Sequence, residues 1–315
     1  MKLITQPQIK SLNIAPAQCV EWVKESFSLK SQAQLPAKIS LHPQGNDFFN
    51  TMPCLLPAPH NYFGVKLVHR IKGATPALGG DILLYDSKSG NLLAMMDADW
   101  ITTMRTGAVA TLAIQTFRKS DAQTYGFIGL GNTGRATLLC LLDSEPQVMH
   151  HVLLLRYKDQ AESFIERFKA FDNVQFTICD TAKEIVAQSD VIVSCITEAD
   201  GLLCDDDTLF RKGCLVVPVH TRGFQNCDLF FDKVFADDTA HVCGFKYFDR
   251  FKQFAEIQET IEGLKPGRTN DDERILSYNI GLGLHDVVYA SKLYELLKDT
   301  ATETELPRET AKFWI

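Results

Sequence analysis

Several features that would assign this chain to another class of protein are missing from it. Its nine cysteines include no Cys-x-x-Cys pair and its eight histidines show no metal-ligand spacing, so we expect neither a disulfide framework nor a metal site. No apolar run approaches the roughly 18 residues that cross a bilayer, and the amino terminus lacks a secretory signal. Lysine and arginine form no dense run, and the formal net charge is −7. We therefore expect a cytoplasmic protein that binds neither membranes nor nucleic acids.

The composition is typical of folded domains. The chain has 315 residues, of which 45% are hydrophobic and 23% charged, which suits one large or two modest cores. Cys140, Cys195 and Cys214 lie in apolar runs, and we interpret them as small core residues rather than reactive thiols.

The most informative stretch is GFIGLGNTGRATLLCLL at Gly126–Leu142. An apolar run leads into a Gly-x-Gly-x-x-Gly motif, and a run with helical spacing follows. In such a strand–turn–helix unit the first glycine, Gly129, permits a tight turn, Gly131 lets a pyrophosphate approach the backbone, and Gly134 lets helix and strand pack closely. The free N–H groups at the helix start then point at phosphate. The motif predicts dinucleotide binding, with a glycine turn of some other α/β protein as the alternative.

Short apolar segments alternate with helical patterns from residue 124 onward, which indicates a parallel sheet. Helices are expected over Gln160–Phe171 and from Thr181, where Thr-Ala-Lys-Glu forms a capping box. The expected strands are Thr124–Leu130, His151–Arg156, Val174–Cys179, Val191–Ile196, Cys214–Val219 and Val234–Ala236.

The first 118 residues have a different pattern, with longer strands of mixed polarity, a proline-rich bend and a helix over Ile101–Arg118. We predict an α/β protein in which a Rossmann-type, doubly wound nucleotide-binding domain (119–279) is inserted in a discontinuous α+β domain (1–118 plus 280–315) that binds substrate and forms dimers.

Five sequence blocks occur in an order that resembles the ornithine cyclodeaminase/mu-crystallin family. They are NTMPCLL from Asn50, GVKLVHR from Gly64, DILLYDSKSG from Asp81, TTMRTGA from Thr102, and the glycine loop. Near the end, the segment from Gly281 to Asp286 fits the family's Gly-x-Ala-x-Glu-Asp pattern. The resemblance covers nearly the whole chain and implies the inserted-domain arrangement and a homodimer.

The resemblance also implies a substrate site. Lys66 matches the family's active-site lysine, which takes part in proton transfer, and a buried lysine amine is well suited to that role. Arg105 matches the arginine that binds the substrate carboxylate through a two-pronged fork. Met52 belongs to the Met-Pro block of the same site. We expect Lys66 and Arg105 to be the catalytic pair.

Two departures from the family pattern bear on the substrate. Lys38 stands where family members often have a second carboxylate-binding arginine, so the charge is kept and the fork is lost. Cyclodeaminases carry an aspartate after the fifth Rossmann strand, whereas here the loop reads Val-His-Thr-Arg-Gly, with Arg222 near the aspartate's place. If Arg222 faces the pocket, it would repel the distal amine of ornithine and favour a second carboxylate; otherwise it points to solvent.

The cofactor is expected to be NADP(H), with NAD(H) also possible. The end of the second strand reads Leu-Leu-Arg-Tyr-Lys and holds no acid to bind a ribose, whereas Arg156 and Lys158 suit a 2′-phosphate. Further cofactor contacts are expected from residues in the helix before the loop, in the loop itself and after later strands: Thr106, Asn132, Thr133, Thr197 and Val219.

These observations favour an NAD(P)-dependent oxidoreductase that transfers hydride at the α-carbon of an amino or imino acid. Candidate substrates are cyclic ketimines, a simple amino acid, or an N-substituted amino acid with a second carboxylate. A true ornithine cyclodeaminase, which releases proline and ammonia, is the first alternative. A cofactor-dependent small-molecule binding protein without turnover is the second.

Overall fold

The computed structural model describes residues 1–305, 307 and 311, which fall into two compact units. The mixed-sheet unit comprises 1–13, 31–102 and the chain from 286 onward, and the parallel-sheet unit comprises 14–30 and 103–285. These divisions lie at other residues than the domain boundaries expected from the sequence, at 118/119 and 279/280. Residues 306, 308–310 and 312–315 of the expected carboxy-terminal segment lie outside the described residues.

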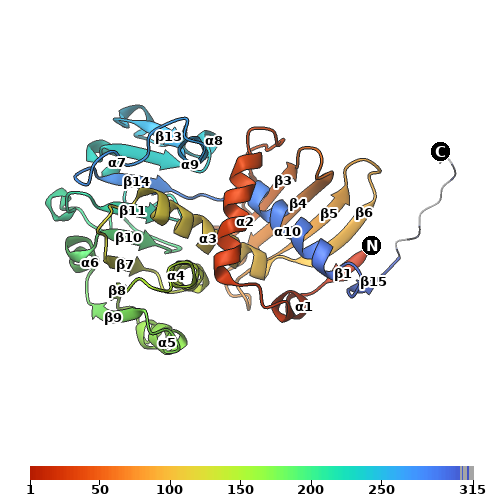
Figure 1. Cartoon of the computed structure of the whole chain (residues 1–315), viewed down its shortest axis with the longest axis horizontal. Helices are drawn as coiled ribbons and strands as arrows, with labels where there is room; N and C mark the ends of the chain where they lie inside the picture. Colours follow the sequence, from red (N-terminus) through yellow and green to blue (C-terminus); the bar gives the residue numbers. More distant parts are fainter. Residues whose placement is uncertain (306, 308–310, 312–315) are drawn as a thin grey trace. The chain divides into compact units, whose positions relative to one another are not determined.

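The parallel-sheet unit contains an eight-stranded sheet in the order β13-β12-β14-β11-β10-β7-β8-β9, and every neighbouring pair is parallel. Its centre has the Rossmann order, in which β7 and β10 flank the point where the winding reverses. The predicted Rossmann fold is therefore confirmed (Figure 1). The strands are β7 (Thr124–Ile128), β8 (His150–Leu155), β9 (Val174–Cys179), β10 (Val191–Ser194), β11 (Leu215–Pro218), β12 (Lys233–Ala236), β13 (Phe254–Glu256) and β14 (Ile275–Tyr278).

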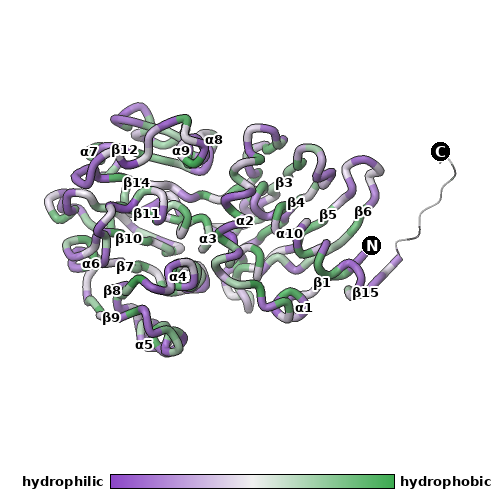
Figure 2. The backbone as a smooth tube through the Cα atoms, viewed as in Figure 1, coloured by the Kyte–Doolittle hydropathy of each residue, from purple (hydrophilic) through white to green (hydrophobic). Residues whose placement is uncertain are grey.

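The central strands of this sheet are fully buried, which explains their mostly apolar sequences. Every residue of β10, β11, β12 and β14 is buried. In Figure 2 hydrophobic colour follows much of the strands and α3, whereas many connecting loops are hydrophilic. Six of the strands lie within two residues of the predicted ranges, whereas β13 and β14 were not predicted. β13 is only three residues long, and β14 enters the sheet between β11 and β12, an order that no local pattern in the sequence indicates.

Eight α-helices belong wholly or mainly to the described part of the parallel-sheet unit. They are α2 (Pro16–Leu29), α3 (Asp99–Phe117), α4 (Asn132–Ser144), α5 (Gln160–Arg167), α6 (Ala182–Gln188), α7 (Cys227–Phe230), α8 (Thr239–Val242) and α9 (Ile257–Ile261). The predicted cap of α6 is present, because Thr181 Oγ1 accepts the Glu184 N–H at 3.2 Å. Short 3₁₀ turns occur at Asp207–Leu209 and Phe248–Arg250.

The helix α2 joins the parallel-sheet unit although it lies far from that unit in sequence. It packs against α4, where the Ala17 N–H donates to Asp143 at 2.8 Å. At its other end, Lys30 forms ion pairs with Glu256 at 2.5 Å and Asp238 at 3.1 Å. Its Val23 and Phe27 side chains are fully buried. The amino-terminal segment therefore supplies a helix to the parallel-sheet unit.

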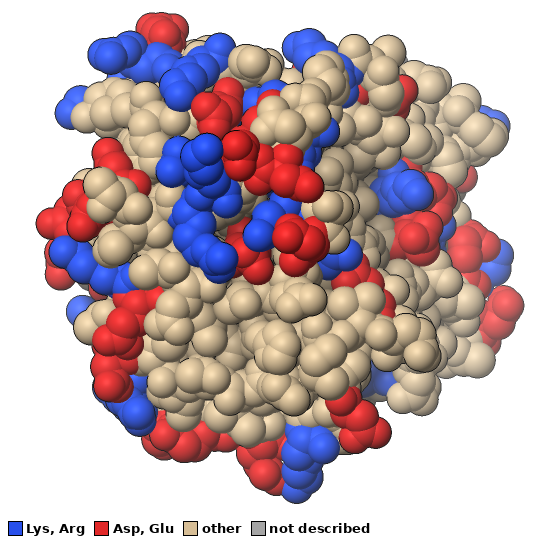
Figure 3. Space-filling model, turned by 60° about the vertical axis from the view of Figure 1, so that its left-hand side comes forward, with Lys and Arg blue, Asp and Glu red and all other residues tan. Residues whose placement is uncertain are grey.

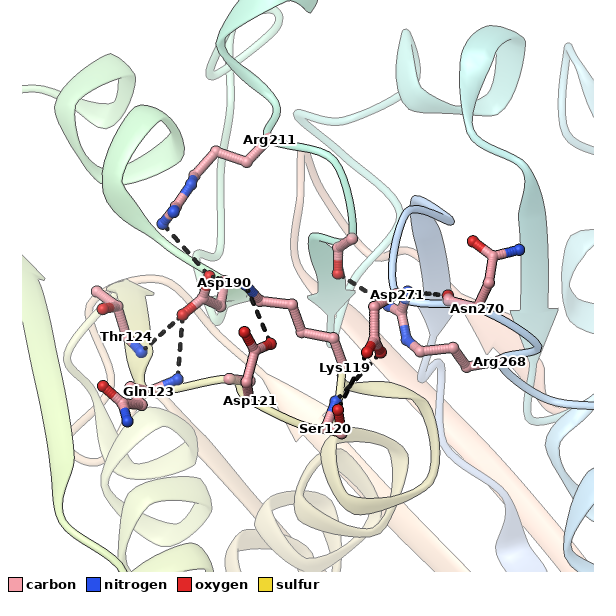
Figure 4. Close-up of polar contacts among 12 residues, drawn as sticks. Lys119, Ser120, Asp121, Gln123, Thr124, Asp190, Arg211, Arg268, Asn270 and Asp271 are labelled. Carbon is pink, nitrogen blue, oxygen red and sulfur yellow. Dashed lines mark hydrogen bonds and ion pairs between the residues drawn. The ribbon is translucent and has the colours of Figure 1, made fainter.

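A polar network fixes the amino-terminal edge of the sheet (Figure 4). The Asp190 carboxylate, just before β10, accepts the N–H groups of Gln123 and Thr124 at 3.0 and 3.1 Å and contacts Lys119 Nζ at 3.0 Å. Burial acts to raise the pKa of Asp190, but these hydrogen bonds and the Lys119 charge outweigh it, so the pKa is lowered. Nearby, Arg268 donates to the carbonyl of Phe117 at 2.8 Å, which satisfies the end of α3. The edge opposite the glycine loop is thus held rigidly.

The mixed-sheet unit contains a seven-stranded sheet in the order β15-β1-β6-β5-β4-β3-β2. Strands β2 to β6 form an antiparallel meander, and β1 pairs in parallel with β6 and antiparallel with β15. The elements are β1 (Lys2–Ile4), α1 (Gln6–Ser11), β2 (Ile39–Leu41), β3 (Phe48–Leu55), β4 (Tyr62–Arg70), β5 (Leu78–Asp86), β6 (Leu92–Asp97), α10 (Gly283–Leu297) and β15 (Thr302–Glu303).

The two faces of this sheet differ. One face is covered by α10, because a side chain added at Gly64 would lie 2.7 Å from Val287. Its residues, including Met52, Ile82, Leu84 and Met96, are buried. The other face carries large apolar side chains that are partly exposed, such as Leu67 and Met95. The strand register places these two on the same side of the sheet. Leu67 pairs with Asp81, and Met95 pairs with Leu83. Asp81 and Leu83 are two residues apart on β5, so they point to the same side.

The surface carries mixed charge. On the face drawn in Figure 3, acidic and basic side chains are interspersed, and one broad area is uncharged. Within the described residues, none of the helices is both long enough and apolar enough to cross a membrane.

Candidate active site

Two of the three glycines in the loop have no space for a side chain. A Cβ on Gly129 (φ +91°) would lie 2.7 Å from the Cys195 carbonyl carbon, and one on Gly134 would lie 2.6 Å from the Gly129 carbonyl oxygen. Gly131 differs, because a Cβ there meets nothing within 4 Å. The first and third glycines are therefore required by the fold, and the second leaves room for a ligand. This cradle fits a dinucleotide pyrophosphate.

The first turn of α4 presents backbone N–H groups at this cradle. Its N-cap is Gly131, which has no capping side chain, and its first turn contains no acidic residue. Asn132 is exposed and Thr133 is half-buried there. A cation that sequence reasoning missed, Arg135, follows in the same turn. Burial and the nearby Arg167 charge lower the pKa of Arg135. The helix start therefore suits an anion electrostatically.

The end of β8 carries the two basic residues proposed for the ribose phosphate. Arg156 and Lys158 are both exposed, and Lys158 Nζ lies 5.2 Å from the Tyr157 ring centroid. Arg156 is already engaged, since its Nε donates to Asp180 at 2.7 Å and its Nη1 lies 3.5 Å from Glu162. Sequence reasoning missed Asp180, which follows β9, because it compared only residues next to Arg156 in the chain. Parallel strands bring their carboxyl ends to one edge, and an acid arrives there from the neighbouring strand.

A serine and a histidine join the ends of β10 and β11. His220 Nδ1 accepts the Arg222 N–H at 3.1 Å, so the ring proton lies on Nε2 and is donated to Ser194 Oγ at 2.7 Å. Burial and, second, the Arg222 charge lower the pKa of His220 to about 4. The lowered pKa favours the neutral ring, which links Ser194 to the loop that carries Arg222. This loop includes half-buried Val219 and exposed Arg222, while exposed Thr197 follows β10.

Arg105 lies in α3 and is almost fully buried, with Thr106 half-buried beside it. Its guanidinium group lies against Gly281, because a Cβ on that glycine would be 2.5 Å from Arg105 Nη1. Two residues further along α3, Gly107 packs so closely on α4 that a Cβ there would lie 2.5 Å from the Ala136 carbonyl carbon. Close packing of the two helices thus fixes the part of α3 that carries Arg105.

The mixed-sheet unit contains a buried ion pair. Lys66, on β4, places Nζ 2.7 Å from Asp286 Oδ2, and both side chains are completely inaccessible to solvent. Asp286 lies in the first turn of α10, where the helix dipole favours a carboxylate. Met52 is directly opposite Lys66 in the β3–β4 register and is also buried. The structure thus brings Lys66 and Met52 together and adds Asp286, to which sequence reasoning assigned no role.

Most of the cysteines are buried, whereas Cys243 is exposed. All nine cysteines are free, and burial raises the pKa of both Cys195 and Cys54 to about 12, with Asp286 as the second cause at Cys54. Cys140 and Cys214 are buried, as expected of core residues. Among the described residues, no group of three or more histidine, cysteine or acidic side chains could hold a metal ion.

The predicted residues therefore fall into two groups. The parallel-sheet unit holds Arg105, Thr106, the glycine loop and the residues after β8, β10 and β11. The mixed-sheet unit holds Met52, Lys66 and Lys38, the last half-buried just before β2. The roles of these residues in binding and catalysis remain predictions.

An α/β fold with a Rossmann-type sheet, a glycine cradle and a separate buried lysine defines a class of dinucleotide-binding proteins. Within that class, the sequence profile of the ornithine cyclodeaminase/mu-crystallin family matches residues 2–301. The chain belongs to this family.

Relatives with assigned activities include reductases and dehydrogenases. The chain is 25% identical over 264 residues to an N-((2S)-2-amino-2-carboxyethyl)-L-glutamate dehydrogenase of Staphylococcus aureus, covering 78% of this chain and 77% of that one. It has the fold of a Δ¹-pyrroline-2-carboxylate reductase of Thermococcus litoralis solved with NADH and L-proline, with a TM-score of 0.85, 23% identity and coverage of 96% and 100%. An archaeal alanine dehydrogenase dimer with bound NAD gives a TM-score of 0.81 at 24% identity, with coverage of 97% and 99%.

The cradle geometry generates a prediction about two glycines. Gly131→Val is expected to keep the fold and lose cofactor binding, because its side chain would project into the space left for the pyrophosphate. Gly134→Val is the matched control and is expected to destabilise the protein by roughly 1–3 kcal/mol, because its side chain meets backbone. Thermal melting and calorimetric titration with NADPH and NADH measure the two effects. Wild-type affinity in Gly131→Val would show that phosphate binds elsewhere.

Proposed function

We propose that the protein is an NAD(P)-dependent oxidoreductase that acts at the α-carbon of an amino or imino acid. The observation that carries the proposal is the buried Lys66–Asp286 pair, in a chain that also builds an open dinucleotide cradle. Burying two charges is costly, and well-packed apolar residues often stabilise a core as well as a buried ion pair does. When bound, the nicotinamide supplies or accepts the hydride. The relatives named for reductase and dehydrogenase activities support this class of reaction.

The residues of the chain divide the remaining work. Arg105 binds the substrate carboxylate through its guanidinium fork, and Lys38 supplies a second cation. Lys66 donates a proton to the imine nitrogen during reduction and accepts it in the reverse direction. Asp286 holds Lys66 Nζ in place and sets a carboxylate 2.7 Å from it. Lys66 thus acts as an acid in the reductive direction, for which a charged lysine is required.

The substrate class follows from the loop after β11. A cyclodeaminase needs a carboxylate there, whereas this loop holds a neutral His220 and an exposed Arg222. We infer that cyclic ketimines, simple amino acids or N-substituted amino acids with a second carboxylate are better substrates than ornithine. The Staphylococcus aureus relative, whose named substrate carries more than one carboxylate, supports the last of these.

Replacement of Lys66 tests the proposed reaction. Lys66→Met is expected to lower kcat by about 10²–10⁴-fold, the usual contribution of a positioned acid or base. The double variant with Asp286→Asn removes both buried charges, so a kcat loss that persists in a folded double variant is chemical. Lys233→Met is the matched control, because Lys233 is also buried but bonds only to nearby structural groups, including the Gly267 carbonyl at 2.6 Å.

The assay follows NAD(P)H absorbance with a panel of cyclic ketimines, alanine, ornithine and N-carboxyalkyl amino acids. Turnover of an imine or amino acid with matching cofactor oxidation or reduction supports the proposal. Efficient, stoichiometric release of proline and ammonia from ornithine would replace it with cyclodeamination. No turnover of any compound, together with tight ligand binding, would favour a binding protein.

We further propose that NADP(H) is the preferred cofactor. The Nη atoms of Arg156 and the Lys158 ammonium are the cations at the end of β8, and neither residue is buried. Asp180 occupies only the Nε side of Arg156, which orients the guanidinium group. Glu162 lies 3.5 Å from Nη1, so a 2′-phosphate would bind the exposed Nη atoms in competition with this weaker contact.

Arg156→Ser is expected to reduce the preference for NADPH over NADH by about tenfold, since a charged hydrogen bond contributes roughly 1.5–3 kcal/mol. Arg211→Ser, at the opposite edge of the sheet beside Asp190, is the control and should leave both affinities unchanged. Calorimetry measures both. A tenfold preference of the wild-type protein for NADH would contradict the proposal.

The open sheet face supports a homodimer. Its partly exposed apolar side chains lie on β2, β3, β4 and β6, and they are Ile39, Leu41, Phe49, Leu67 and Met95, which are 38–65% exposed. Asp81 and Asp97 lie on the same face, so the exposed apolar side chains share it with carboxylates. Large apolar side chains exposed together mark an interaction site, and a second copy of the sheet offers the same chemistry. The archaeal alanine dehydrogenase of the same fold is described as a dimer.

Leu67→Glu is expected to convert the dimer to monomers, because it places a charge in the centre of the apolar face. Leu264→Glu, at an exposed leucine of the parallel-sheet unit, is the control and should leave the dimer intact. Sedimentation equilibrium should give about twice the chain mass of 35.3 kDa for the wild type. A wild-type monomer at micromolar concentration would rule the dimer out.

A further inference from the structure

Gly281 stands at a point where the chain has no room for a side chain. Its φ is +98°, a conformation that other residues adopt at a cost. A Cβ built on it would lie 2.5 Å from Arg105 Nη1, 3.2 Å from Nη2 and 3.3 Å from Cζ. The guanidinium group therefore lies directly against the Gly281 backbone. The backbone angle favours glycine, and a Cβ there would displace the guanidinium group of Arg105.

The Gly281 backbone is itself fixed by a buried carboxylate. Asp237, which follows β12, is fully buried, and its Oδ2 accepts the Gly281 N–H at 2.5 Å. Its Oδ1 lies 3.5 Å from His241 Nδ1, and its own N–H donates to the Tyr278 carbonyl at 3.2 Å. Burial acts to raise the pKa of Asp237, but the interactions with His241 and Gly281 outweigh it, so the pKa is lowered. The carboxylate thus remains charged and holds the glycine in one position.

We propose that Gly281, anchored by Asp237, is a positioning residue that sets where the Arg105 guanidinium group lies. The inference rests on the proposed function, in which Arg105 binds the substrate carboxylate. The guanidinium group of Arg105 packs against the backbone of Gly281, so the position of this backbone limits how far the guanidinium group reaches toward the substrate. A substitution at Gly281 alters substrate affinity, while cofactor binding at the glycine loop is unaffected.

Gly281→Ala tests this role. It is expected to raise KM for the carboxylate substrate by about 10–100-fold, since a misplacement near 1 Å has effects of this size. The dissociation constant for NADPH should stay within about twofold of wild type, because the cradle residues are unchanged. Gly263→Ala is the matched control, because Gly263 also has positive φ (+74°) but a Cβ there meets nothing within 4 Å. It should also strain the backbone, because φ is positive there too, and leave KM unchanged.

A double-variant comparison shows whether the effect passes through Arg105. Lysine at 105 lacks the planar fork that meets Gly281, so Gly281→Ala should raise KM much less in the Arg105→Lys background. If Gly281→Ala melts below the assay temperature, Asp237→Asn replaces it. That variant keeps the shape of the side chain, weakens the anchor, and should raise KM by a smaller factor.

The outcomes separate this inference from the proposed function. If Arg105→Ala leaves KM unchanged, Arg105 does not bind the carboxylate and the proposed role of Arg105 fails. If Arg105→Ala raises KM strongly but Gly281→Ala matches Gly263→Ala, only the inference about Gly281 is overturned. Equal KM increases from Gly281→Ala with arginine and with lysine at 105 would also overturn it.

Discussion

The ion pair between Lys66 and Asp286 is the constraint that organises the mixed-sheet unit. Neither side chain touches solvent, so each charge is tolerated only because the other lies 2.7 Å away. The two residues are 220 positions apart in the chain. Lys66 lies on β4, in the middle of the meander, and Asp286 lies in the first turn of α10. The sheet and its covering helix must be in register for either charge to be accommodated. A group suited to proton transfer is thereby built into the core rather than added to a loop.

In the parallel-sheet unit, close steric contacts at glycines constrain the structure. Gly129, Gly134, Gly107 and Gly281 each lie against another group at a distance that excludes a Cβ, whereas Gly131 faces open space. The same residue type thus has two uses here. Four glycines let backbone, helix or arginine approach closely, and the fifth leaves its side of the loop open.

Much of the parallel sheet could be predicted from the sequence because its strands are buried on both sides and read as short apolar runs. The capped start of α6 and the glycine loop were also visible, since both depend on residues near each other in the chain. The partners of the site residues were not. Asp286 for Lys66, Asp180 for Arg156 and Gly281 for Arg105 come from other strands or helices, and no local pattern records which segments a fold brings together. The short strands β13 and β14 and the transfer of α2 to this unit escaped prediction for the same reason.

The place of α2 has a consequence for how the protein is divided. The segment 103–285 would seem to be a complete nucleotide-binding cassette, yet the unit found in the structure also needs residues 14–30. Cut out alone, that segment would lose the helix that packs on α4, the Lys30 partner of Glu256 and the Ser26 partner of His285. The unit is not modular in the sense of a transplantable domain. Recombination between family members would have to exchange two separated stretches of the chain together.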